Sequence, residues 1–220
     1  LQGFDNLELA IKWMNKAISH YEMKRSNQGA SHRESNLVFD VDADGTTIIR
    51  LMHKVGFKAL VNKNYNESKD IFTSSYDMAV RPEISDDNLK ILSSELIAKT
   101  DFATGDVEKA RSRLLQLQKE GLTWGGYRLL GDIYKEDAEQ RNVSAYKDAI
   151  SSYQTAIKLS NGTITDADLH YNLGSSLLND GQYDQAAESL RTSMSLQPNN
   201  SHVLNNLGVA YFHLNRRAEA

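Results

Sequence analysis

The chain has 220 residues, of which 40% are hydrophobic and 25% are charged, and its formal net charge is −4. This composition predicts a folded, packed protein rather than a disordered one, and so mild a charge gives no reason to expect a nucleic acid partner, since a phosphate binder needs a concentrated basic face. The lack of cysteine excludes disulfides, thiolate metal sites and thiol nucleophiles.

No apolar run approaches the ~18 residues that span a bilayer, so we expect no direct membrane insertion. The first residue is Leu1, which favours a fragment of a longer protein, and localisation stays open between the cytoplasm and a bacterial periplasm or envelope.

Helical spacing of small and large residues extends along most of the chain, and only two prolines interrupt it. In chain order, the pattern predicts one helix over residues 1–24 and an interruption over residues 25–46. Helical hairpins are then expected over residues 47–82, 88–123, 124–163 and 167–200, and a partial one over 201–220.

The interruption ends in an acidic turn, in which Asp40, Asp42 and Asp44 alternate before Gly45. This spacing matches the first half of an EF-hand calcium loop, and calcium is therefore one candidate ligand. Position 12 of such a loop should be a bidentate glutamate, but here it is Leu51. We therefore favour no metal, and expect the acidic residues and the threonines after them to cap a helix that begins near residue 48.

A repeat period is visible near the C-terminus, where the triplet at residues 172–174, Asn-Leu-Gly, recurs at residues 206–208. Counting Ala167 as position 1, the small residues Gly174 and Ala186 fall at positions 8 and 20, where two helices approach closely, and Leu190 at position 24 fills the space between them. This register resembles the tetratricopeptide repeat (TPR) family, whose unit is two antiparallel helices, A and B, in 34 residues.

The resemblance implies an all-α fold, an α-solenoid of antiparallel helix pairs forming a right-handed superhelix. Residues 1–24 are then a partial repeat (helix B), 25–46 a loop or linker, 47–82 and 88–123 TPR-like repeats, and 167–200 and 201–220 a complete and a partial repeat. Residues 124–163 form a repeat with six extra residues, which lengthen the A–B turn or extend a helix. The last two repeats are closest in style to bacterial envelope and pilus-assembly TPR proteins.

In the family, positions 2, 5, 6, 9, 12 and 13 of helix A tend to face an inner groove. The peptide-groove candidates on these positions are Arg128, Asp132, Lys135, Tyr171, Asn172, Ser175, Asn179, Asn205, Asn206, Val209 and His213. Because position 5 is Tyr171 and Asn205 in the last two repeats, a carboxylate clamp is disfavoured. Asn172 and Asn206 at position 6 match an asparagine ladder that holds a peptide backbone, although asparagine is also simply common there.

No catalytic constellation accompanies the repeats: no histidine pair lies at i, i+4, and no phosphate loop or nucleophile elbow occurs. His170 at position 4 is expected to be a core histidine, and the tyrosines and tryptophans are expected to be mostly core. We therefore expect no enzyme and no cofactor, but a scaffold that binds an extended peptide or a partner helix within a larger assembly. The alternatives are a regulatory or targeting arm of an enzyme and self-association through the last repeat.

Overall fold

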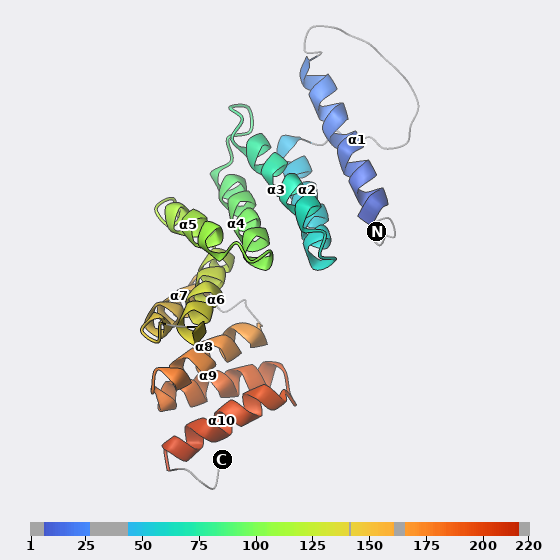
Figure 1. The fold of residues 1–220 in the computed structure, drawn as a ribbon. Coiled ribbons are helices and arrows are strands. Elements are labelled where there is room, and N and C mark those ends of the chain that lie inside the picture. The colour runs from blue at the N-terminus through green and yellow to red at the C-terminus, as the bar shows by residue number, and fades with distance from the viewer. Residues whose placement is uncertain (1–6, 27–43, 141, 161–165, 216–220) are drawn as a thin grey trace. The chain divides into compact units, whose positions relative to one another are not determined.

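A computed structural model of the chain describes residues 7–26, 44–140, 142–160 and 166–215 (Figure 1). Every regular element in these ranges is an α-helix, and none is both long and apolar enough to cross a bilayer. The helices are α1 (Leu7–Ser26), α2 (Gly45–Val61), α3 (Tyr65–Ala79), α4 (Asp87–Ala103), α5 (Val107–Leu117), α6 (Trp124–Gln140), α7 (Ala145–Leu159), α8 (Ala167–Asn179), α9 (Tyr183–Leu196) and α10 (Ser201–His213).

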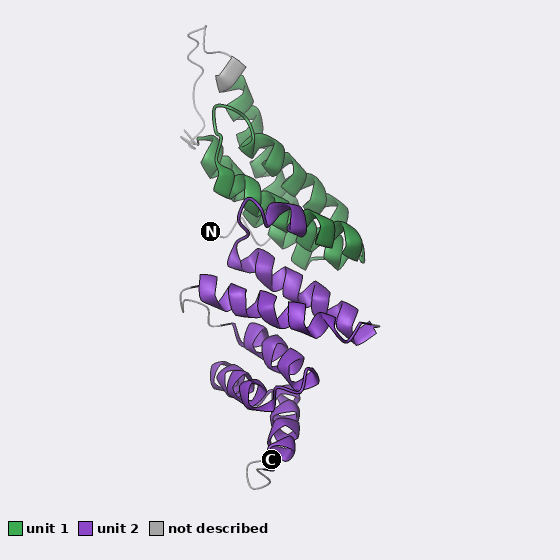
Figure 2. Ribbon diagram, turned by 90° about the vertical axis from the view of Figure 1, so that its left-hand side faces the viewer, with its two compact units in different colours: residues 1–113 green, residues 114–220 purple. Residues whose placement is uncertain are grey.

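The chain divides into two compact units, residues 1–113 (unit 1) and residues 114–220 (unit 2), and α5 crosses the division (Figure 2). In unit 1, α1 packs on α2, α2 on α3 and α3 on α4. In unit 2, each helix from α6 to α10 likewise packs on the next one in the chain. Helices that follow one another therefore form successive pairs, and this confirms the predicted all-α solenoid.

Glycine at position 8 lets the two helices of a pair approach closely in three places. A Cβ atom built on Gly56 would lie 2.6 Å from the Phe72 ring, and one on Gly131 would lie 2.4 Å from the Tyr153 ring. At Gly174, it would lie 2.7 Å from Leu190 and 3.3 Å from the backbone of position 20. The large residue at position 24 therefore occupies the space that each glycine leaves, which is the packing that the sequence register predicts.

The turn between helices A and B has the same backbone form in both units. The residue at position 15 has a positive φ in four places: Lys63 (62°), Gly105 (85°), Gly181 (79°) and Asn215 (56°). After α2, α4 and α8, the N–H of the following residue bonds a carbonyl five residues back, as in Asn64 to Ala59 at 2.9 Å. This is the Schellman closure of a helix, which favours glycine at its left-handed position.

Acidic and amide side chains cap the N-termini of four helices A. The side chains of Asp44, Asp86, Asp166 and Asn200 each accept a hydrogen bond from a backbone N–H in the first turn of the helix that follows. Asp44 accepts from the Thr47 N–H at 2.8 Å, so the capping interpretation is confirmed for this residue, although α2 begins at Gly45 rather than near residue 48. These bonds also lower the pKa of Asp44. The other two calcium candidates, Asp40 and Asp42, lie outside the described residues.

The extra residues of the 124–163 hairpin lengthen helix A. Helix α6 has 17 residues against 13 in α8 and continues to Gln140. Its added turn places Ala138 against Ala145 and Tyr146 in a small buried cluster. Both tryptophans depart from the expectation of core positions, because Trp13 and Trp124 are 44% and 40% exposed.

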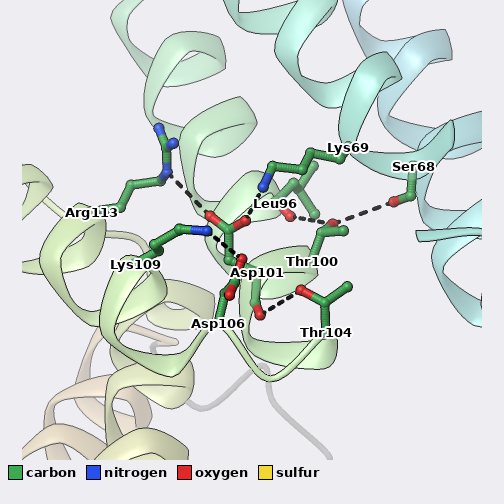
Figure 3. A network of polar contacts seen from close by, with 9 residues as sticks. All are labelled: Ser68, Lys69, Leu96, Thr100, Asp101, Thr104, Asp106, Lys109 and Arg113. Atoms are coloured by element: carbon green, nitrogen blue, oxygen red, sulfur yellow. Dashed lines mark hydrogen bonds and ion pairs between the residues drawn. The ribbon is translucent and has the colours of Figure 1, made fainter. Parts of the chain in front are cut away.

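The interface between α3 and α4 in unit 1 contains a layer of polar residues (Figure 3). The side chain of Asp101, only 1% exposed, lies 2.5 Å from Lys69 Nζ and 3.8 Å from Arg113 Nε. Beside it, the Thr100 hydroxyl donates to the Leu96 carbonyl at 2.9 Å. Position 11, which is Tyr134, Leu177 and Tyr211 in unit 2, is thus a paired carboxylate here, and removing both cations would leave a buried charge uncompensated.

Candidate peptide-binding face of unit 2

The predicted groove residues lie on three helices that contact one another in sequence, α6 with α8 and α8 with α10. We call the surface of these three helices that carries the candidate residues the helix-A face. Helix α6 supplies Arg128, Asp132 and Lys135; α8 supplies Tyr171, Asn172, Ser175 and Asn179; α10 supplies Asn205, Asn206, Val209 and His213.

Asp132 is the centre of a hydrogen-bond network that joins three helices. Its Oδ1 atom accepts from the Tyr153 hydroxyl on α7 at 2.9 Å and from Asn172 Nδ2 on α8 at 3.1 Å. Burial raises the pKa of Asp132, while the two donors and the charges of Arg128 and Lys135 oppose that rise. Burial and the neighbouring carboxylate also raise the pKa of Tyr153, so this hydroxyl stays protonated and remains a donor.

The network fixes the orientation of the Asn172 side chain. Because Nδ2 must face the Asp132 carboxylate, the amide oxygen is turned the other way. Among the described residues, Asn172 makes no other side-chain hydrogen bond, so Oδ1 and the second N–H are open. Two helices therefore hold a half-buried amide with one acceptor and one donor available.

Two cationic candidates on α6 are already engaged in ion pairs. Arg128 pairs through Nη1 with Asp166 Oδ2, and the other oxygen of that carboxylate caps α8 through the Leu169 N–H at 3.1 Å. Lys135 pairs with Glu139 one turn further along α6 at 2.7 Å. Arg128 thus ties α6 to the start of α8.

The remaining α8 candidates differ in their exposure. Ser175 is buried, at 8% exposure, and its backbone carbonyl accepts from Asn179 Nδ2 at 2.9 Å. Asn179 itself is exposed, whereas Tyr171 packs partly buried against the cluster of Leu190, Val203 and neighbouring residues.

Helix α10 presents amides next to apolar surface. Asn205 Nδ2 donates to Asn206 Oδ1 at 3.4 Å, close to the outer limit for a hydrogen bond. Val209 is 38% exposed, and the ring of His213 stacks on that of Tyr183, with centroids 4.3 Å apart. The structure therefore places Asn206 within an exposed, partly apolar surface.

Sequence reasoning missed Tyr153, which bonds to Asp132, and Asp166, which pairs with Arg128. Tyr153 sits at position 24, where the register predicts packing, yet a buried tyrosine hydroxyl needs a partner, and that requirement points toward a polar residue on the preceding helix A. Asp166 precedes the predicted repeat start and carries only an N-cap signal.

His170 is half-buried beside a shallow depression between α7, α8 and α9, and burial lowers its pKa while Asp166 opposes the shift. Within the described ranges, no group of three or more His, Asp or Glu side chains could hold a metal ion.

Comparisons with a protein family and with solved structures show what these repeats are similar to. The tetratricopeptide repeat family model matches residues 137–191 and 171–220, and no curated protein sequence gives a significant match. Among solved structures, MamA (AMB-1) is 19% identical, with a TM-score of 0.56 over 78% of this chain and 85% of that chain. YrrB, described as a TPR protein with an unusual peptide-binding site, is 13% identical, with a TM-score of 0.55 over 77% and 79% of the two chains.

TTC0263, a thermophilic TPR protein in Thermus thermophilus, is 20% identical, with a TM-score of 0.55 over 78% of this chain and 85% of that chain. At these identities, the likeness establishes the fold. The family match covers residues 137–220, all within unit 2, and the fold that the chain shares with these solved structures is that of a tetratricopeptide repeat solenoid.

Proposed function

We propose that this chain is a non-catalytic scaffold that holds an extended peptide on the helix-A face of unit 2. A TPR solenoid supports a role in protein interaction, and one solved TPR structure of similar fold is described as having a peptide-binding site. The observation that carries the proposal is the open amide of Asn172, held in place by Asp132.

The chemistry of this amide suits a peptide backbone. Its free Oδ1 accepts from a peptide N–H while its free Nδ2 hydrogen donates to the carbonyl of the same segment. The side chain is already fixed by its bond to Asp132, so binding costs little further side-chain entropy. Asn206 occupies the same position of the next repeat and supplies a second amide for the same strand of peptide.

Apolar surface lies close to the second amide. Val209 is 38% exposed and Phe212 60% exposed on α10, within two turns of Asn206. These side chains offer contacts to the side chains of a peptide whose backbone lies on the amides. The proposed partner is therefore an extended segment with apolar residues, recognised mainly through its main chain.

The test compares one fluorescent peptide in two forms, unmodified and N-methylated at alternate residues, by anisotropy. Asn172→Ala combined with Asn206→Ala should weaken binding of the unmodified peptide by about tenfold or more, at roughly 1 kcal/mol for each lost pair of hydrogen bonds. N-methylation removes backbone N–H donors, so it should weaken binding to the natural chain but cause no further loss in the double variant.

The matched control is Asn66→Ala combined with Asn88→Ala, two exposed asparagines on α3 and α4 of unit 1. This control should bind like the natural chain, and circular dichroism should show unchanged helix content in both double variants. Equal affinity of the natural chain and the Asn172/Asn206 variant would refute the proposal.

Self-association through α10 and the role of an enzyme's regulatory arm remain predictions of the sequence. Light scattering at increasing concentration tests the first, and a constant monomer mass would contradict it.

A further inference from the structure

One face of α2 in unit 1 carries a stripe of exposed residues that packing does not explain. Arg50, Lys54, Phe57 and Val61 follow one another at spacings of four, three and four, which places them within about 60° of one another around the helix. All four are exposed, whereas α2 packs on α1 through other residues such as Ile48 and Met52. We call these four residues, with Lys99 of α4, the basic stripe.

The charge of the stripe is not balanced on its own helix. Helix α2 contains no aspartate or glutamate, and neither Arg50 nor Lys54 forms a salt bridge with a described residue. The charge of Arg50 helps to lower the pKa of the Asp44 carboxylate, but the hydrogen bonds that this carboxylate accepts cap the N-terminus of the helix. Glu95 on α4 is buried, at 5% exposure, and so does not cover the surface.

An aromatic residue links the basic stripe to the neighbouring helix A. The Lys99 ammonium lies 4.9 Å from the centroid of the Phe57 ring, and Phe57 remains 43% exposed. Val61, one turn further, is 65% exposed. The stripe therefore changes along its length, from cations alone to a cation over an aromatic ring and then to bare apolar surface.

We propose that the basic stripe binds an extended acidic peptide segment that also carries apolar side chains. From Arg50 to Val61, the helix rises about 16 Å, the length of roughly five extended residues. Carboxylates of the segment lie against Arg50 and Lys54, and an aliphatic or aromatic side chain contacts Phe57 and Val61. This surface belongs to unit 1, so it is additional to the function proposed for unit 2 and does not depend on it.

The same observations disfavour a nucleic acid as the occupant. A phosphate backbone carries charge at every step, whereas the stripe ends in the exposed apolar side chain of Val61. An acidic peptide can carry charged side chains toward one end and apolar side chains toward the other, which matches the order of groups on α2. The mild net charge of the whole chain conceals this local excess.

The experiment uses anisotropy to measure binding of a fluorescein-labelled ten-residue peptide to the full chain; the first half of this peptide is Glu and the second half is Leu. Its competitors are the same peptide with Gln for Glu, and a dT20 oligonucleotide. We expect the acidic peptide to bind at low ionic strength and to weaken as salt is added, because exposed charges are screened. The Gln peptide should bind at least about tenfold more weakly.

Arg50→Glu combined with Lys54→Glu should weaken binding of the acidic peptide by about tenfold or more, and Phe57→Ala should weaken the Glu and Gln peptides alike. The matched charge control is Lys12→Glu combined with Lys147→Glu, two exposed lysines outside the stripe. This control should retain binding, as should the Asn172/Asn206 variant of unit 2.

Three outcomes would overturn the proposal. The first is equal affinity of the chain for the Glu and Gln peptides. The second is an equal loss of affinity in the control variant and the stripe variant. The third is tighter binding of dT20 than of the acidic peptide, where dT20 binding also depends on Arg50 and Lys54. Circular dichroism of each variant shows whether a loss reflects binding or unfolding.

Discussion

Acidification should destabilise unit 1 through the buried side chain of His53. This ring on α2 is only 8% exposed, and its Nε2 lies 2.7 Å from Ser93 Oγ on α4. The Ser93 hydroxyl donates to the Leu89 carbonyl at 2.7 Å, so it accepts from His53, which therefore carries its proton on Nε2. Binding a second proton would place a charge between packed helices, and burial lowers the pKa of His53 to about 4.

The size of the effect follows from linkage. An unfolded histidine has a pKa of about 6.5, so between that pH and about 4 the unfolded chain binds a proton at this residue that the folded chain does not. Stability is therefore unaffected above about pH 7 and falls as the pH drops through this window. The loss attributable to His53 is about 2 kcal/mol between pH 7 and pH 5, and about 3 kcal/mol in full.

The assay is urea unfolding at several pH values in a Trp124→Phe background, where Trp13 alone reports on unit 1. His53→Gln keeps a donor for Ser93 but has no titrating ring, so its free energy of unfolding should lose about 2 kcal/mol less than the parent between pH 7 and pH 5. His202→Gln, at an exposed residue of unit 2, is the control and should leave the pH dependence of unit 1 unchanged. The reasoning fails if the His53→Gln variant and its parent lose stability equally over this range.

Two further substitutions test the packing of the repeats. Gly131→Ala should destabilise unit 2 by about 1–3 kcal/mol, because the new methyl group would meet the fully buried Tyr153 ring. Gly125→Ala is the control and should not lower the melting temperature, because the nearest atom to its new methyl group would be Thr123 Oγ1 at 3.4 Å. Lys63→Gly should stabilise unit 1 by about 0.5 kcal/mol by relieving a left-handed lysine, and Gly181→Ala should cost unit 2 about 1 kcal/mol in chemical unfolding. Melting temperatures that move in the opposite direction would contradict either assignment.

The sequence predicted most of the architecture because the repeat register depends on side-chain size. Gly174 and Leu190 could be paired from their spacing alone, and the structure confirms their contact. The polar contacts could not be predicted in this way. His53, Ser93 and Asp101 carry no periodic signal, since each depends on residues more than thirty positions away or on another helix.

In the candidate site, too, the sequence predicts the positions of residues but not their polar contacts. Helical spacing placed Asp132 and Asn172 on helices A, but only the structure shows that they bond to each other and that Tyr153 completes the network. The net charge of the chain could not reveal the basic stripe either, because the acidic residues that balance its charge lie elsewhere in the chain. Spacing identifies which face a residue occupies, whereas its chemistry depends on the neighbour that the fold supplies.

Position 9 of helix A shows how one scaffold can present different surfaces. In the predicted register it is Phe57, Lys99, Asp132, Ser175 and Val209 in successive repeats, whereas positions 8 and 15 are constrained by close packing and by the turn. Phe57 and Lys99 contact each other across neighbouring helices A, and Asp132 instead orients the Asn172 amide. No single packing role fixes position 9, because Ser175 is buried whereas Phe57 and Val209 are exposed, and its chemistry varies from repeat to repeat. The two proposals therefore predict different ligands for the two units, an acidic segment for unit 1 and a peptide main chain for unit 2.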